Sequence, residues 1–132
     1  ALRTSRAVPY TLQAAIAGLH ARAERAEQTD WPQIAALYDL LLRMQPSAVI
    51  ELNRAVAVAM VAGPLSGLVL VDALAVRGEL AGYHLLPATR AEFLRRLDRP
   101  DEAAVAYGQA LSLAPTEPER RFLGRRLASL PR

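Results

Sequence analysis

Apolar residues recur along the chain at spacings of three and four residues, as on one face of an α-helix. In "GLVLVDALAV", the stretch richest in β-branched residues, Leu68, Val71 and Leu74 keep this spacing and do not alternate as in a strand. Prolines and glycines divide the pattern into stretches of about 12 to 18 residues, long enough for helices of three to five turns. The pattern predicts seven helices, at 9–27, 31–44, 47–62, 65–77, 81–97, 101–113 and 117–130.

Polar caps support two of the predicted helix starts. Thr29 and Asp30 precede Trp31-Pro32, and a polar cap followed by an early proline is typical of a helix N-terminus. The stretch 98–101 has the same kind of stop and restart. The tight turns between short helices favour a repeat architecture.

One stretch near the C-terminus carries a repeat motif. In "DEAAVAYGQALSLAP", Ala103, Tyr107, Ala110 and Pro115 stand at spacings of four, three and five residues. This pattern resembles the second helix of a tetratricopeptide repeat, and Ala91, twelve residues earlier, supplies the small residue where the two helices of such a repeat cross. Small side chains let the backbones approach closely, and the tyrosine would fill the adjoining gap.

Two earlier stretches fit the same frame. Its anchor residues are Ile34, Gly67 and Ala103, which are 33 and 36 residues apart, close to the 34-residue period of the family. The middle copy has Ala55 twelve residues before Gly67, although Glu79 stands where a proline would end the helix. The first copy continues from its anchor with Tyr38, Leu41 and Pro46.

The last predicted helix, "EPERRFLGRRLASL", has one apolar stripe, as a terminal cap requires. We expect that stripe to be buried, and it consists of Phe122, Leu123, Leu127 and Leu130. The sequence therefore predicts an all-α fold, a right-handed α-solenoid of about three helix pairs with a C-terminal capping helix.

Composition agrees with this fold. The chain has 132 residues, 52% of them hydrophobic but only 5% aromatic, with alanine and leucine dominant. This favours close-packed helices over a β-sandwich or barrel. The length suits one self-sufficient domain over 1–132. Because the chain starts at Ala1, without a methionine, we expect it to be a fragment or a processed chain whose function belongs to a larger protein.

The charge is modest, with a formal net value of +3, and all 16 basic residues are arginines. The arginines are densest in two groups, one of Arg90, Arg95, Arg96 and Arg99 and the other of Arg120, Arg121, Arg125, Arg126 and Arg132. Acidic residues lie among both groups and dilute their charge, namely Glu92, Asp98, Asp101, Glu117 and Glu119. A solvated helix face is therefore favoured over a nucleic-acid surface, which stays an alternative. With no cysteine, no long apolar run and no signal sequence, we expect a cytoplasmic protein without disulfides or membrane spans.

Catalytic and metal-binding motifs are missing from the sequence. His20 and His84 are 64 residues apart, and neither has the neighbours of a metal-binding motif. There is no glycine-rich phosphate loop and no serine nucleophile elbow. We expect a protein that is not an enzyme and that has no metal or other cofactor.

Asn53, the sole asparagine, is the main candidate for binding. In a tetratricopeptide array the first helix of each pair lines the concave wall, and Asn53 lies two residues before the crossing residue Ala55. Its amide could hold the backbone or C-terminus of a bound peptide. An equally weighted alternative is that it hydrogen-bonds a neighbouring helix or turn and holds the superhelix together, with Glu51 and Arg54 as ordinary surface or inter-helix charges. The corresponding wall residues in the other repeats are Gln13 with His20, and Thr89 with Glu92 and Arg96.

Five segments taken in order resemble the C-terminal extension of bacterial extracytoplasmic-function sigma factors that carry a tetratricopeptide-like domain. They cover residues 9 to about 114 and read "PYTLQAAIAGLHA", "TDWPQIAALYDLL", "ELNRAVAVAM", "AGYHLLPATRAEFLRRL" and "DEAAVAYGQAL". The resemblance implies a role in transcription initiation, in which this helical domain controls activity through protein contacts. It also implies that the chain alone should not recognise a promoter, because the N-terminal sigma regions are not in the sequence.

The implied partner is the sigma factor's own N-terminal regions, core RNA polymerase or a signalling protein. From chemistry and position we assign the contacts to Asn53, Arg54, Tyr83, His84 and Arg90, although packing within a turn is the favoured interpretation of Tyr83 and His84. Two other functions remain open. One is a free-standing adaptor that captures a peptide C-terminus, and the other is nucleic-acid binding through the arginine faces.

Overall fold

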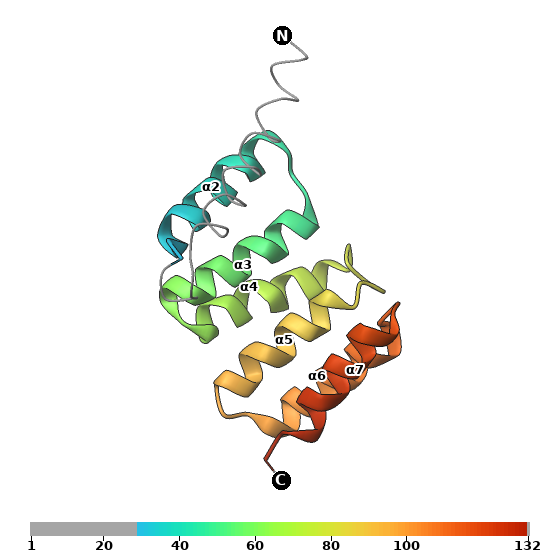
Figure 1. Cartoon of the computed structure of the whole chain (residues 1–132). Helices are drawn as coiled ribbons and strands as arrows, with labels where there is room; N and C mark the ends of the chain where they lie inside the picture. Colours follow the sequence, from blue (N-terminus) through green and yellow to red (C-terminus); the bar gives the residue numbers. More distant parts are fainter. Residues whose placement is uncertain (1–28, 132) are drawn as a thin grey trace.

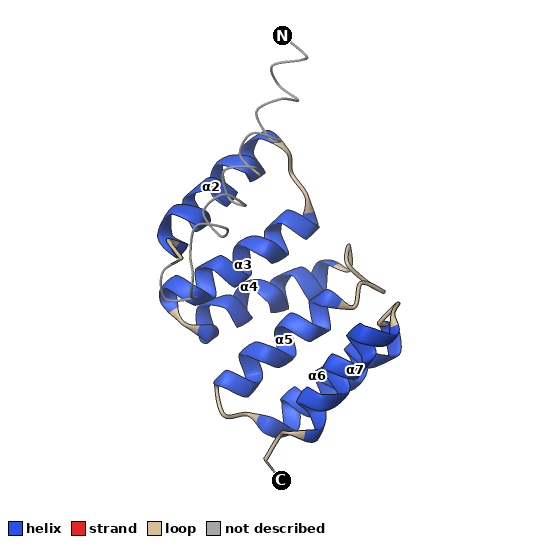
Figure 2. Ribbon diagram, viewed as in Figure 1, coloured by secondary structure: helices blue, strands red, loops and turns tan. Residues whose placement is uncertain are grey.

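The computed structural model describes residues 29–131, and all regular structure in this range is helical. The prediction of an all-α protein is confirmed for that part of the chain (Figures 1 and 2). The helix predicted at 9–27 lies outside the described residues. The helices are α2 (Trp31–Met44), α3 (Ala48–Ala62), α4 (Pro64–Arg77), α5 (Leu85–Arg96), α6 (Pro100–Leu113) and α7 (Glu117–Ala128).

Side-chain caps set three of the helix starts. Asp30 accepts a hydrogen bond from the backbone N–H of Gln33 at 3.1 Å, so the predicted cap of α2 is confirmed. Ser47 and Thr116 cap α3 and α7 in the same way. Each of these oxygens satisfies a backbone donor that has no partner within its helix.

Two predicted boundaries differ from the structure by more than one residue. Helix α5 begins at Leu85 and not at residue 81, because Gly78 and Gly82 both adopt positive φ values, 78° and 88°, and hold the segment between them in turns. Helix α7 ends at Ala128 and not at residue 130, since a turn at Ser129 follows it.

The helices follow one another in chain order from one end of the array to the other (Figure 1). Each helix packs mainly against its neighbours in sequence. Two contacts also link alternate helices: Arg96 on α5 reaches Met60 on α3, and Glu92 on α5 pairs with Arg126 on α7. Helices α3, α5 and α7 therefore share one surface. Helix α4 packs against α3 and α5, and α6 packs against α5 and α7.

Small residues are buried where the helices meet, as predicted. Ala55, Ala91 and Ala103 have no exposed surface, and Gly67 is buried too. A Cβ atom added to Gly67 would lie 2.7 Å from the Cβ atom of Ala59 on α3 and 2.7 Å from the ring of Phe93 on α5. The backbones of α3 and α4 thus approach as closely as a glycine allows. Tyr107 on α6 is also fully buried, and its hydroxyl donates a hydrogen bond to Glu92 on α5.

Helix α7 covers the end of the core with fewer side chains than expected. Leu123 is buried, and Leu127 and Leu130 pack against the core while partly exposed. The prediction that Phe122 is buried is wrong, because this side chain is 46% exposed. It precedes Leu123 by one residue, about 100° around the helix, and its ring carries the guanidinium group of Arg126 at 5.3 Å.

Within residues 29–131, no helix combines the length and the apolar composition needed to cross a bilayer.

Candidate functional site

Helices α3 and α5 and the turn before α5 carry the predicted contact residues of the described range, and we refer to the surface shared by α3, α5 and α7 as the wall. Asn53 and Arg54 lie on α3, Tyr83 and His84 lie in the turn before α5, and the others, Arg90, Glu92 and Arg96, lie on α5. Gln13 and His20 lie outside the described residues. The remaining candidates differ in whether their polar groups are engaged within the fold.

Two of the arginines form ion pairs between helices. Arg54 pairs through Nε with Asp39 on α2. The Nε of Arg90 donates to Asp72 on α4 at 2.8 Å. Both guanidinium groups therefore join neighbouring helices, as the alternative interpretation expected for Arg54.

His84 connects the start of α5 to α7, and Tyr83 packs beside it. Their rings meet edge to face at 5.8 Å, and Nε2 of His84 lies 3.2 Å from Oε2 of Glu119. The His84 side chain is only 12% exposed. These contacts fit the favoured interpretation of packing within a turn. His84 also lines an apolar pocket of about 260 Å³, together with Leu85, Ala88, Pro118, Glu119, Phe122 and Leu123.

Glu92 is the centre of a polar cluster between three helices. Its Oε1 accepts a hydrogen bond from the Tyr107 hydroxyl at 2.6 Å, and its Oε2 accepts one from Nη2 of Arg95 at 2.8 Å. The Nε atom of Arg126 lies 3.2 Å from Oε1 as an ion pair. We call Glu92, Arg95, Tyr107 and Arg126 the Glu92 cluster. It joins α5 to α6 and α7.

The electrostatics of this cluster favour a fixed charge. Burial alone would raise the pKa of Glu92, but the bonds from Tyr107 and Arg95 and the charge of Arg126 outweigh it, so the pKa lies below its usual range. Burial, together with the bond to the carboxylate, raises the pKa of Tyr107 to about 12. Neither group would exchange a proton near neutral pH, so the cluster fits a structural role better than acid–base chemistry.

Asn53 and Arg96 differ from the other candidates. Within residues 29–131, no side chain hydrogen-bonds the Asn53 amide and no carboxylate pairs with the Arg96 guanidinium group. Asn53 is exposed and its amide forms no hydrogen bond with this part of the chain. Arg96 has no carboxylate partner there, and its nearest polar contact is the Met60 sulfur atom, 3.6 Å from Nη1. The equally weighted alternative, in which Asn53 bonds a neighbouring helix, has no such bond among the described residues.

The two free groups lie on the same side of the wall. Met60 follows Asn53 by seven residues, about two helical turns, and therefore lies on the same face of α3. Arg96 reaches this face from α5 through its contact with Met60. We call these three residues the Asn53–Arg96 strip. It offers an amide, a thioether and a guanidinium, groups that suit a peptide backbone, an apolar side chain and a carboxylate.

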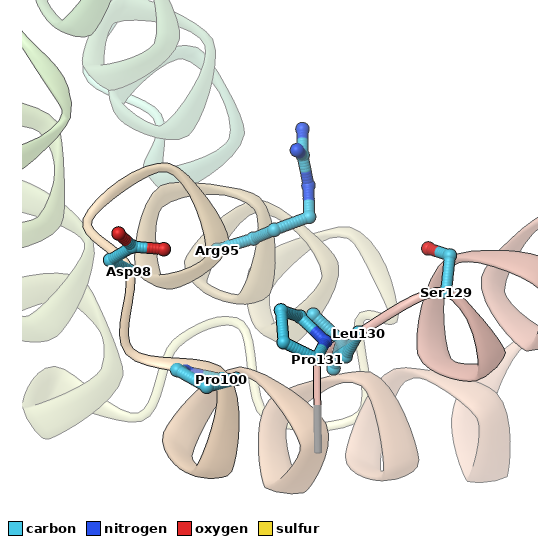
Figure 3. Close-up of a pocket in the computed structure, with 6 residues that line it drawn as sticks. All are labelled: Arg95, Asp98, Pro100, Ser129, Leu130 and Pro131. Carbon is cyan, nitrogen blue, oxygen red and sulfur yellow. The ribbon is translucent and has the colours of Figure 1, made fainter.

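A second pocket, of about 220 Å³, lies between the C-terminal ends of α5 and α7 (Figure 3). Figure 3 shows the side chains of Asp98 and Ser129 on opposite sides of it, with the guanidinium group of Arg95 turned away from Pro131. Arg95 is engaged by Glu92. The rest of the lining is Pro100 and Leu130. Across residues 29–131, no three His, Cys, Asp or Glu side chains gather as a metal site would require.

Sequence reasoning found Asn53 and Arg96 of the strip but missed Met60 and the Glu92 cluster. Glu92 was expected to face a ligand, and its bonds to Tyr107 and Arg126 join residues 15 and 34 positions apart, which no local pattern relates. The i,i+3 pair with Arg95 was the one available signal.

Comparison with known proteins gives one informative relative. No protein-family model matches the sequence, and no solved structure matches it significantly. The chain is 46% identical over 130 residues to the uncharacterized protein R00370 of Rhizobium meliloti (strain 1021). The match takes in 98% of this chain but 30% of that relative, so the similar region is one part of a much longer protein there.

Proposed function

We propose that this chain is a protein-interaction and regulatory module of an extracytoplasmic-function RNA polymerase sigma factor. It acts in transcription initiation through protein contacts and does not recognise a promoter by itself. Its architecture is a right-handed α-solenoid of about three tetratricopeptide-like helix pairs with α7 as the cap. The observation that carries the proposal is the burial of Ala55, Gly67, Ala91 and Ala103, in the positions that the ordered repeat segments require.

The packing of the helices supports the solenoid. In such arrays each unit contacts mainly its neighbours, and the end of the array needs a helix with one apolar and one polar face. The helices here pack mainly with their neighbours in sequence, and α7 presents Leu123 to the core and arginines to solvent. The exposed wall of α3, α5 and α7 would be the binding surface.

The state of the arginines favours a protein partner over nucleic acid. Phosphate binding requires guanidinium groups that are not already neutralised. Most arginines of the described range have a carboxylate within ion-pair distance, namely Arg54, Arg77, Arg90, Arg95, Arg99, Arg121 and Arg126. Among residues 29–131 this leaves only Arg43, Arg96, Arg120 and Arg125 without a carboxylate partner, too few for a continuous phosphate-binding track in that range.

The Asn53–Arg96 strip is where the partner would bind. An exposed amide and an unpaired guanidinium can hold a backbone and an acidic group without any rearrangement of the fold. The partner class is a protein segment with at least one carboxylate, contributed by the N-terminal sigma regions, by core RNA polymerase or by a signalling protein. The long relative from Rhizobium supports a module that works within a larger protein.

Two observations test the proposal. The gene sequence upstream of the codon for Ala1 should encode sigma regions, and the tagged chain should retain core polymerase or those regions in a pull-down. An upstream sequence without sigma regions, together with capture of peptides that depends on a free C-terminal carboxylate, would instead establish the adaptor alternative. Tight binding to duplex DNA with a steep salt dependence would establish the nucleic-acid alternative.

A further inference from the structure

Helix α4 exposes an apolar face to solvent. Leu65 is 59% exposed, Val69 62% and Val76 89%, and Ala73 between them is exposed as well. They lie on the side of the helix opposite its buried residues, which are Gly67, Leu68, Val71 and Leu74. We call these four exposed residues the α4 stripe. A contiguous exposed apolar patch of this kind commonly marks an interaction site.

The stripe is specific to α4. Counted from the buried residues Ile34, Gly67 and Ala103, the same four positions can be compared on α2, α4 and α6. On α6 they are Asp101, Val105, Gln109 and Ser112. On α2 they are Pro32, Ala36, Leu40 and Arg43. Only α4 is apolar at all four positions, so general exposure of the outer helix faces does not account for the stripe.

The charges beside the stripe are already neutralised within the chain. Asp72 pairs with Arg90 at 2.8 Å, and Arg77 pairs with Glu51 at 2.8 Å and also with Glu79. Asp72 and Arg77 are the charged side chains of α4 itself. A partner face with charges of its own would have to bury them unpaired, at a cost of several kcal/mol. The surface that best complements the stripe is therefore another uncharged apolar helix face.

We propose that the α4 stripe is a homodimer interface, in which α4 packs against α4 of a second copy. An antiparallel arrangement about a two-fold axis places Leu65 opposite Val76 of the other copy and Val69 opposite Ala73. Near the axis, Val69 thus meets the smaller Ala73. The antiparallel arrangement also opposes the two helix dipoles, which is favourable. This interface goes beyond the proposed function and uses a different face from the wall.

The interface should be weak. A standard interface buries about 800 Å² on each partner, and one helix face of four side chains supplies less than that. Association should consequently depend on concentration within the range that sedimentation equilibrium covers, up to about 1 mM.

Two matched variants test the interface. Val69 and Val105 are both valines, both 62% exposed, and occupy the same position on α4 and α6. The unaltered chain should form dimers, Val69→Glu should weaken dimerisation about 100-fold or more because each copy would bury a carboxylate, and Val105→Glu should dimerise as before. A chain that stays monomeric at about 1 mM, or equal effects of the two substitutions, would overturn the proposal.

Disulfide trapping tests the orientation, because the chain has no cysteine of its own. Mixing Leu65→Cys with Val76→Cys should give cross-linked dimers on oxidation, whereas Leu65→Cys alone should not, since the two copies of residue 65 would be about 16.5 Å apart along the helix axes. Cross-linking of Leu65→Cys with itself, or no cross-linking in the mixture, would contradict the antiparallel arrangement.

Discussion

Gly67 is a position at which this fold leaves no room for a side chain. The nearest atoms of α3 and α5 lie only 2.7 Å from the place where its Cβ atom would be. Gly108 provides a contrast, because it also lies inside a helix but has nothing within 4 Å of the Cβ position.

We predict opposite effects of substituting these two glycines. Gly67→Leu should lower the free energy of unfolding by roughly 1–3 kcal/mol or more through overpacking. Gly108→Ala should raise it by about 0.4–1 kcal/mol, because alanine restricts the unfolded chain and clashes with nothing. Urea denaturation of the two variants checks both values. Equal stability of Gly67→Leu and the unaltered chain would show that the helices do not cross as closely as described.

Asn53 should behave as a surface residue in the same assay. Asn53→Ala should change the free energy of unfolding by less than about 0.5 kcal/mol, since the amide has no hydrogen-bond partner within residues 29–131. Ala91→Leu, at a position without exposed surface, should cost roughly 1–3 kcal/mol. A loss from Asn53→Ala as large as that from Ala91→Leu would restore the alternative in which Asn53 holds the helices together.

The buried small residues could be predicted from the sequence because their spacing repeats. Ala55, Gly67, Ala91 and Ala103 recur in register with the helix pairs, and steric fit leaves little choice of residue there. The partners of Glu92 could not be predicted, since they depend on how α5, α6 and α7 are oriented in space. Candidate site residues were consequently found by position, and the structure then separated the engaged ones from the free ones.

At the scale of the elements, α7 combines one buried apolar residue with several polar contacts. Its one buried apolar residue is Leu123, while Arg126 reaches the Glu92 cluster and Glu119 meets His84. The attachment of α7 should consequently depend on the charge of Glu92.

Removing that charge should destabilise the chain. Glu92→Gln should lower the free energy of unfolding by roughly 1–3 kcal/mol at pH 7, because it leaves two arginines short of a carboxylate in a half-buried cluster. Glu102→Gln is the matched control, since Glu102 pairs with Arg99 on the exposed surface, and it should cost no more than about 1 kcal/mol. Equal losses for the two variants would argue against a special role of the cluster.

The stability difference between the unaltered chain and Glu92→Gln should depend on pH with a definite sign. The pKa of Glu92 is lower in the folded chain than in the unfolded chain, where it is about 4.3. Its contribution is therefore complete above about pH 4.3 and is lost as the pH falls through the lower folded value. The stability difference between the unaltered chain and Glu92→Gln should be constant from pH 7 to pH 5 and shrink below pH 4. A difference that grew in acid would contradict the assigned direction.

The start of α5 shows the limit of element prediction. Gly78 was correctly expected to end α4, and the next helix was expected to follow within three residues. The second left-handed glycine, Gly82, lengthens the turn and delays the helix to Leu85. A glycine in a sequence permits this conformation without requiring it, so the boundary depended on the packing of Tyr83 and His84.

At the scale of the whole molecule, the helices are stabilised mainly by their neighbours in sequence. One apolar core extends from α3 to α7, and α2 joins the array through two smaller clusters, at Leu41 with Ile50 and at Ile34 with Ala57. Stability in such an array is not uniform, because its end units have fewer neighbours.

Hydrogen exchange should report this gradient. Amides of α7 should exchange faster than those of α5 and α6, because α7 lies at the end of the array and buries one residue fully. Mass spectrometry of the exchanging chain can resolve the helices. Uniform protection from α3 to α7 would indicate a single cooperative globule.

The sequence supported the all-α class at this scale because helical periodicity is a local property. It did not reveal the α4 stripe, since an apolar helix gives the same pattern whether or not its outer face is covered. Exposure is decided by the arrangement of neighbouring helices.

The most direct test of the proposed function is the affinity of the purified chain for core RNA polymerase and for the sigma regions encoded upstream of it. Calorimetry should detect binding to one of them. The double variant Asn53→Ala with Arg96→Ala should weaken it at least tenfold, while Arg43→Ala, at an exposed position on α2, should leave it unchanged. Absence of binding to both, or equal weakening by the double variant and Arg43→Ala, would contradict the account.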